Sequence, residues 1–406
     1  MTSTETPVIE SATRFRAGTL DQAHAYLKEL RARQVDVVVG RDQIEARQGR
    51  LIVKTNTPRG DLTVIPTPHM ESQMATELGI SLKHLRAVRA RSLSAVNVGL
   101  DPEVDESTAL RGDAAWRYMM ADAFHVGRRA HMLRLYSNQA DIFDGRCLLS
   151  PSYGRFDNLN CTDVAMRALM AAGLNVDTTD VRMDLTDRRM VLKVNVPQIN
   201  VLAREWLKGY RNPLSPSHSG YQAGEEPIVE AGIIITNGET GGAGLAMGPY
   251  FRVKICKNGL TVPVELAKWT RDHKGSRMDV GELAAAEDTA EAFSQWVTLT
   301  MRDNIRRWLS PEYMNETILQ WEVKSVRRIE TDTAPDFFRE LGRSLIWTED
   351  ESDQILQMWN RGGQFTTGGV MHAVTAYTQT IPNADRAWEL ELSAEGALNR
   401  AYALAR

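Results

Sequence analysis

The chain has 406 residues, with 48 lysines and arginines against 52 aspartates and glutamates, so its formal net charge is −4. Hydrophobic residues make up 43% of it and charged residues 25%, a composition that excludes collagen-like, mostly disordered and disulfide-scaffold proteins. The nearly balanced charge excludes a global attraction to nucleic acid, so any such binding has to come from local basic patches.

The cysteines and the N-terminus bear on location. The three cysteines, Cys147, Cys161 and Cys256, form no CxxC pair, which favours a reducing compartment. Residues 1–18 lack the apolar core of a signal peptide, and the longest stretch without a plainly polar side chain, 241–251, is far shorter than the roughly 18 apolar residues of a membrane span. We expect a cytoplasmic protein without membrane association.

The first region, residues 19–145, has the pattern of a mixed α/β module. Residues 1–18 before it are rich in Thr, Ser and Glu, and we expect them to form a flexible arm. Apolar residues at helical spacing and alternating residues predict helices over 20–34, 67–90 (broken near Gly79) and about 113–125, and strands over 35–39, 50–55, 61–65 and 131–137.

The second region, residues 146–280, has the pattern of a helix followed by antiparallel hairpins. Capping residues and a final glycine predict a helix over 161–173. Alternating apolar residues predict one hairpin over 181–185 and 190–196, and a second strand pair over 229–237 and 248–256, joined by the glycine-rich stretch 238–244.

The third region, residues 281–406, has a helical pattern throughout. We expect helices over 282–309, 311–329, 335–342, 349–360, 366–379 and 384–405, with a capping box of Thr348 and Glu351. The sequence therefore predicts an α+β fold: antiparallel β-hairpins with packed helices and a helical C-terminal third.

Three segments of the second region carry a set of turn and hairpin motifs. The first has a tyrosine in a turn, an arginine and an Asp-Asn step before a helix, and the second is the adjoining hairpin over 184–197. The third has an Asn-x-Glu-x-Gly step and a Cys-x-Asn-Gly turn. The residues that carry these motifs are Tyr153, Arg155, Asp157, Asn158, Asn237, Glu239, Gly241, Cys256, Asn258 and Gly259. With them the three segments resemble the phage- and plasmid-associated domain-of-unknown-function family 932.

The resemblance covers residues 148–275 and implies a protein of phages, prophages or plasmids, which would act in the host cytoplasm. The family has no settled activity. A helix followed by long antiparallel hairpins and another helix is also loosely similar to single-strand annealing proteins of homologous recombination, an analogy at the level of the fold.

Basic residues gather near tryptophans at three places. Lysines and arginines neutralise phosphates and an exposed aromatic ring stacks on a base, which is the combination that single-strand binders use. The alternative is solvated helix faces with the tryptophans, Trp308 and Trp321 among them, in the core. The candidate nucleic-acid-binding residues are Lys254, Lys257, Lys268, Trp269, Arg271, His273, Lys274, Arg277, Arg302, Arg306 and Arg307; Lys324, Arg327 and Arg328 form the third cluster.

Residues 74–88 have the spacing of a helix-turn-helix. Ala75 is the small residue and Gly79 the turn glycine, and Ile80, Leu85 and Val88 supply core positions. A simple helical hairpin satisfies the same spacing. In either case the second helix is expected to expose Lys83, His84, Arg86 and Arg89.

Other motifs point to chemistry less directly. The stretch Gly241–Gly244 has no Gly-Lys-Ser/Thr and precedes a predicted strand, so we expect a flexible hairpin loop and not a phosphate cradle. His125, His131, Asp141 and Asp144 could hold Mg²⁺, but surface turns explain them more simply. Cys256 is expected to be a core residue.

Together with the basic clusters, the resemblance implies a DNA-binding protein of a phage or mobile element that acts in recombination or single-strand annealing. We expect it to bind single-stranded DNA in preference to duplex, to be non-enzymatic, to need no cofactor and, like the loosely similar annealing proteins, to form a homo-oligomer. The alternatives are a phage assembly or interaction protein that docks through its helical third, and a metal-dependent nuclease.

Overall fold

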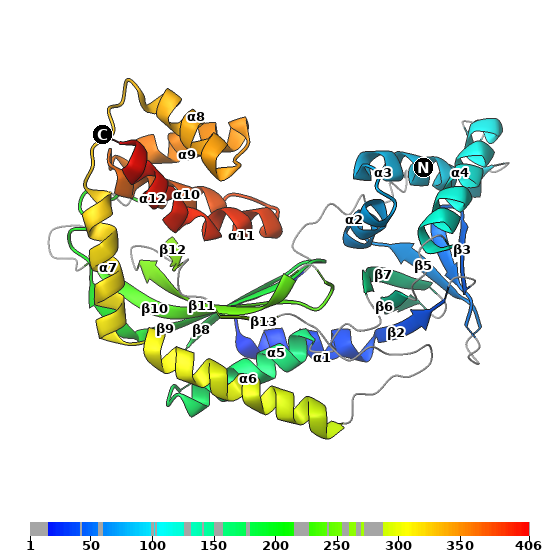
Figure 1. The fold of residues 1–406 in the computed structure, drawn as a ribbon, viewed down its shortest axis with the longest axis horizontal. Coiled ribbons are helices and arrows are strands. Elements are labelled where there is room, and N and C mark those ends of the chain that lie inside the picture. The colour runs from blue at the N-terminus through cyan, green and yellow to red at the C-terminus, as the bar shows by residue number, and fades with distance from the viewer. Residues whose placement is uncertain are drawn as a thin grey trace.

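The computed structural model shows two β-sheets, each covered by helices, joined end to end (Figure 1). We call the larger unit the main body and the smaller one, residues 34–149, the inserted module, because it lies between two helices of the body along the chain. The structure describes residues 15–40, 43–55, 60–98, 101, 104–125, 131–139, 142–149, 157–175, 179–214, 227–241, 243–253, 260–264, 269–271 and 287–405.

The sheet of the main body is antiparallel, with the strand order β1-β8-β9-β10-β11-β12 and with β13 also paired to β11. The hairpins predicted from alternation are confirmed as β8–β9 and β10–β11. The strands are β1 (Phe15–Ala17), β8 (Asp180–Leu185), β9 (Met190–Leu202), β10 (Ile228–Gly238), β11 (Ala243–Val253), β12 (Leu260–Pro263) and β13 (Trp269–Arg271).

Helices cover both faces of this sheet, with α1, α5 and α6 below it in Figure 1 and α10, α11 and α12 above it. The helical C-terminal third is confirmed. The helices are α1 (Leu20–Ala32), α5 (Asn158–Ala171), α6 (Glu287–Trp308), α7 (Pro311–Ser325), α8 (Ala334–Leu345), α9 (Glu349–Gly362), α10 (Thr367–Thr378), α11 (Ala384–Leu392) and α12 (Ala394–Leu404).

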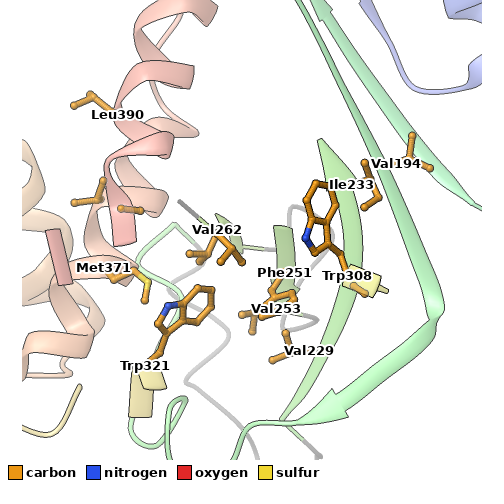
Figure 2. Packing of buried hydrophobic residues seen from close by; sticks show 14 of the residues in the cluster. Val194, Val229, Ile233, Phe251, Val253, Val262, Trp308, Trp321, Met371 and Leu390 are labelled. Atoms are coloured by element: carbon orange, nitrogen blue, oxygen red, sulfur yellow. The ribbon is translucent and has the colours of Figure 1, made fainter. Parts of the chain in front are cut away.

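Strand β10 shows why the sheet needs helices on both sides. Ile233 belongs to the large core cluster with Phe251 and Trp308, whereas its neighbour Ile234 packs with Trp388 of α11. Successive side chains of a strand point to opposite faces, so both faces of β10 are buried, as its nearly continuous apolar sequence requires. Figure 2 shows the first of these clusters.

The inserted module has a six-stranded sheet of order β2-β6-β7-β5-β4-β3, in which only β5 and β7 are parallel. It has its own core, which includes Leu51, Val64, Met74, Trp116 and Leu133. Its elements are β2 (Gln34–Val39), β3 (Ile44–Arg47), β4 (Arg50–Val53), β5 (Leu62–Pro66), α2 (Pro68–Glu77), α3 (Leu82–Ser94), the 3-10 turn η2 (Ala95–Asn97), α4 (Glu106–His125), β6 (His131–Gln139) and β7 (Ile142–Leu149).

Two elements near the N-terminus differ from expectation. Phe15–Ala17, which we placed in a flexible arm, is the edge strand β1 and pairs with β8. Helix α1, which we placed with the first region, packs instead on α5 of the main body. Ala23 and Leu27 supply its buried face, and Arg31 donates two hydrogen bonds to Asp157, the N-cap of α5. The inserted module therefore begins only at residue 34.

Candidate nucleic-acid interface

Most of the residues predicted to bind nucleic acid lie outside the described residues. These are Lys254, Lys257, Lys268, His273, Lys274 and Arg277. Trp269 and Arg271 lie in β13, where their backbones pair with Met247 and Leu245 of β11. Arg302, Arg306 and Arg307 lie on α6.

The basic residues of α6 and α7 do not surround exposed tryptophans. Trp308 is 4% exposed and Trp321 is 1% exposed, and Trp321 packs edge-on against Phe251 (Figure 2). Neither ring is available to stack on a base, so the alternative interpretation of core tryptophans is confirmed for both.

The nearby cations hold helix ends in place. Arg302 pairs with the adjacent Asp303, and Arg306 donates to the carbonyl oxygen of Ala171 at 2.8 Å. Lys324 donates to Asn399 at 2.7 Å, and Arg327 donates to the carbonyl oxygens of Tyr402 and Ala405 at the end of α12. These contacts give the clusters a structural role in the helical third.

Helices α2 and α3 meet at a tight turn that the sequence specifies. Gly79 has φ of +64°, a conformation that favours glycine, directly after the end of α2. The N–H of Ile80 donates to the carbonyl oxygen of Ala75 at 3.0 Å, and that of Gly79 donates to Thr76 at 3.1 Å, which is a Schellman motif. Ser81 then caps α3 by accepting from the N–H of His84.

The positions that define a helix-turn-helix are buried at this turn. Met74, Ala75, Leu85 and Val88 are all below 8% exposed, and Ile80 packs against the same cluster. Glu71 of α2, itself 5% exposed, forms ion pairs with Arg86 and Arg89 of α3. The two helices are thus held by an apolar contact and a buried carboxylate, which fixes the angle at which α3 is presented.

The outer face of α3 is basic and exposed to solvent. Lys83, His84, Ala87 and Arg91 are exposed, and none of them forms an ion pair within the described part of the chain. From Ser81 to Ser94 the sequence has one lysine and three arginines and no acidic residue. The expectation for Arg89 was wrong, because its side chain is 13% exposed and turns inward to Glu71 and to the carbonyl oxygen of Gly49.

The β3–β4 turn contacts α3 through Gly49. Gln48 and Gly49 both have positive φ, 51° and 69°, which is the two-residue turn that suits a hairpin. The N–H of Gly49 donates to Ser92 of α3 at 2.7 Å, and Ser92 donates in turn to Asp113 of α4 at 2.8 Å. The second helix is therefore anchored at both ends to the module's core.

A second polar cluster lies where the inserted module meets the main body. Glu239, 3% exposed, follows the last residue of β10; its carboxylate accepts from the Tyr136 hydroxyl at 2.9 Å and from the N–H of Asn158 at 2.8 Å. Arg134 donates to the carbonyl oxygen of Glu239 at 2.9 Å and to both oxygens of Asp36. We call these residues, together with Arg146 and Asp187, the junction network.

The junction network consists of paired charges in a closed interior. Arg134 and Arg146 are 1% and 2% exposed, and Arg146 bonds to Asp187 at 3.1 Å. Burial opposes the charge of Arg134, but the carboxylates of Asp36 and Glu239 outweigh it and raise its pKa. Burial and the charge of Glu239 raise the pKa of the Tyr136 hydroxyl.

Segments of the family resemblance meet at this network. Asp157 and Asn158 come from the first segment, the turn after β8 from the second, and Asn237 and Glu239 from the third. The residue before the stretch expected to be a flexible hairpin loop, Thr240, is held in place, because its carbonyl oxygen accepts from His69 at 2.9 Å and from Gln73 at 3.2 Å. Ala243 of that stretch already belongs to strand β11. Tyr153 and Arg155 lie outside the described residues.

A small cavity of about 10 Å³ lies between α9, α10 and the segment after β9, lined in part by Tyr210, Met358, Trp359 and His372. This volume suits one water molecule. His372 donates from Nδ1 to the side-chain oxygen of Gln364 at 2.6 Å, and its Nε2 has no hydrogen-bond partner among the described residues. Burial lowers the pKa of His372 to about 3.

We expect the stability of the main body to fall in acid because of His372. Its pKa is lowered in the folded state, so the unfolded chain binds the proton more tightly. Stability is therefore full above about pH 6.5, the ordinary histidine value, and falls as the pH drops towards 3. Urea unfolding of wild type and His372→Gln between pH 4 and 8 checks this, with the exposed His84→Gln as control. An equal pH dependence in wild type and His372→Gln would contradict it.

The residues considered for metal binding or nucleophilic chemistry do not form a site in the described part of the chain. No group of three His, Cys, Asp or Glu side chains there could hold a metal ion, and Asp141 lies outside it, as does Cys256. Cys147 is fully buried, and burial raises the pKa of its thiol to about 12, which disfavours the reactive thiolate.

Among the described residues, no helix combines the length and the apolar character needed to cross a bilayer. No protein-family model, no curated protein and no solved structure matches the chain.

Proposed function

We propose that this chain binds DNA and that α3 of the inserted module is its contact with duplex DNA. The observation that carries the proposal is the arrangement of α2 and α3: the signature positions of a helix-turn-helix are buried, and the second helix turns a basic face outward. The N-terminal part of such a helix reaches base edges in the major groove, and here it carries Lys83 and His84.

The small side chains of this face support close approach to DNA. Ala87 and Ala90 lie at its centre and are both exposed. They let the helix enter a groove about 12 Å wide, while Lys83 and Arg91 flank them with positive charge; Arg86 at the edge of this face is paired with Glu71. Because the net charge of the whole chain is −4, this local patch has to supply the attraction to phosphates.

Single-strand annealing and recombination rest on a different part of the chain. The residues that suggested them, within 254–277, lie mostly outside the described residues, and Trp308 and Trp321 are buried. The proposal for duplex DNA rests on α3 alone, and the preference for single strands expected from the sequence stays a separate prediction.

Fluorescence anisotropy of labelled 25-nucleotide duplexes and single strands, titrated with the full chain at 50–200 mM salt, tests the proposal. With about four phosphate contacts, we expect duplex affinity to fall roughly 100-fold across this salt range. Preference for the single strand would contradict the role of α3. Absence of binding to either probe at 50 mM salt would contradict DNA binding.

A further inference from the structure

The cavity between α9, α10 and the segment after β9 has one imidazole in an otherwise largely apolar wall. Trp359 and Ala373 line it, and so does His372, which is 2% exposed. The rings of Tyr210 and Trp206 pack against the imidazole, with centroid distances of 4.7 and 5.1 Å. The imidazole is therefore held in a fixed orientation by aromatic neighbours at the edge of a space of about 10 Å³.

The hydrogen bonds of Gln364 fix which nitrogen of His372 carries the proton. The amide nitrogen of Gln364 donates to the carbonyl oxygens of Trp206 and Lys208, both at 3.2 Å. The amide oxygen is therefore the atom that faces Nδ1 of His372, at 2.6 Å. Because an amide oxygen only accepts hydrogen bonds, the proton of the neutral imidazole lies on Nδ1.

The other ring nitrogen is a buried acceptor. Nε2 of His372 then has a free lone pair, and it has no hydrogen-bond partner among the described residues. Burial lowers the pKa of this histidine to about 3, so the ring is neutral at pH 7 and Nε2 keeps its lone pair. A buried acceptor without a donor costs free energy, which favours an occupant of the cavity that donates to it.

A second acceptor belongs to a residue that lines the same cavity. Gly362 is the last residue of α9, and the final carbonyl groups of a helix have no partner within it. The carbonyl oxygen of Gly362 accepts one hydrogen bond, from the N–H of Arg211 at 3.3 Å, and its second lone pair can accept another. An occupant that serves both acceptors has to donate two hydrogens.

We propose that this cavity binds one water molecule, which donates one hydrogen bond to Nε2 of His372 and a second to the carbonyl oxygen of Gly362. Water donates two hydrogens and matches the volume of the cavity. Since both protein groups are acceptors, the site selects a hydrogen-bond donor and rejects an anion. The water links α10 to the end of α9, while Gln364 links His372 to the carbonyl groups of the segment after β9.

A high-resolution crystal structure of the full chain and NMR of the histidine-labelled chain at pH 7 test the proposal together. We expect an ordered water at about 2.7–3.2 Å from Nε2 of His372. Two-bond proton–nitrogen correlations, assigned by comparison with His372→Gln, should place the ring proton on Nδ1. A cavity without a water, or a ring proton on Nε2, would overturn the proposal.

Filling the cavity separates a bound water from an empty space. Ala373→Val adds two methyl groups, which displace the water and leave Nε2 unpaired, so we expect the equilibrium constant for unfolding to rise about 10-fold. In a His372→Leu background no acceptor is left unpaired, and the same change should cost less than about 3-fold. Ala165→Val on α5, also buried, is the control and should act equally in both backgrounds. Equal effects of Ala373→Val in the two backgrounds would show that His372 binds nothing in the cavity.

Discussion

Ala87→Glu is expected to lower the affinity for duplex DNA at least about 10-fold at 100 mM salt. Ala87 is exposed at the centre of the outer face of α3, and a carboxylate there faces the phosphates while it neutralises Arg91, one helical turn further on. The helix itself should persist, because glutamate is a good helix former and the new pair with Arg91 favours the fold. Anisotropy against the labelled duplex measures the loss.

Two further variants separate a local effect at α3 from an effect of net charge. Ala114→Glu adds the same charge at an exposed alanine of α4, away from the outer face of α3, and should bind DNA like wild type. Lys83→Ala should weaken binding moderately and reduce the salt slope by about one, as the loss of one phosphate contact does. If Ala87→Glu and Ala114→Glu weaken binding equally, the effect is one of net charge and α3 is not the contact.

Arg134→Met is expected to destabilise the junction network by about 3–5 kcal/mol. Arg134 is 1% exposed and donates to Asp36 and to the carbonyl oxygen of Glu239, so its removal leaves these oxygens buried without their cation. Hydrogen exchange is the suitable measurement, because it reports on β6 and on the turn after β10 separately. Both segments should exchange faster.

Removing Asp36, the carboxylate that pairs with Arg134, tests whether the unpaired charge causes the loss of stability. In Arg134→Met with Asp36→Leu the uncompensated carboxylate is gone, so the double variant should be more stable than Arg134→Met alone. Arg47→Met, at an exposed position of β3, should stay within about 0.5 kcal/mol of wild type. A single variant as stable as wild type would show that the network does not hold the two units together.

The parts of the fold that were predictable are governed by local chemistry. The turn at Gly79 follows from a glycine between two apolar-spaced segments, and the capping box of Thr348 and Glu351 is present as expected. Strand β7 was missed because its Asp144, Gly145 and Arg146 have the composition of a turn. They are compatible with a buried strand only because Arg146 meets Asp187 of the main body.

The junction network itself could not be predicted, because its partners lie 40 to 105 residues apart along the chain. One signal was present in β6, where Arg134 and Tyr136 alternate with Leu133 and Leu135. Such alternation ordinarily indicates a face open to water. Here the polar face is buried: Arg134 pairs with Asp36 of the neighbouring strand β2, and Tyr136 donates to Glu239 of the main body. Only the fold brings these partners together.

The position of the inserted module between α1 and α5 has a consequence for how the protein is made. A ribosome releases α1 first, but the body surface on which this helix packs is formed from α5 and β8, which are synthesised later. By then all of residues 34–149 have emerged, with a complete core of their own. The unit that carries α3 can therefore fold during translation, before the hairpins of the body are complete.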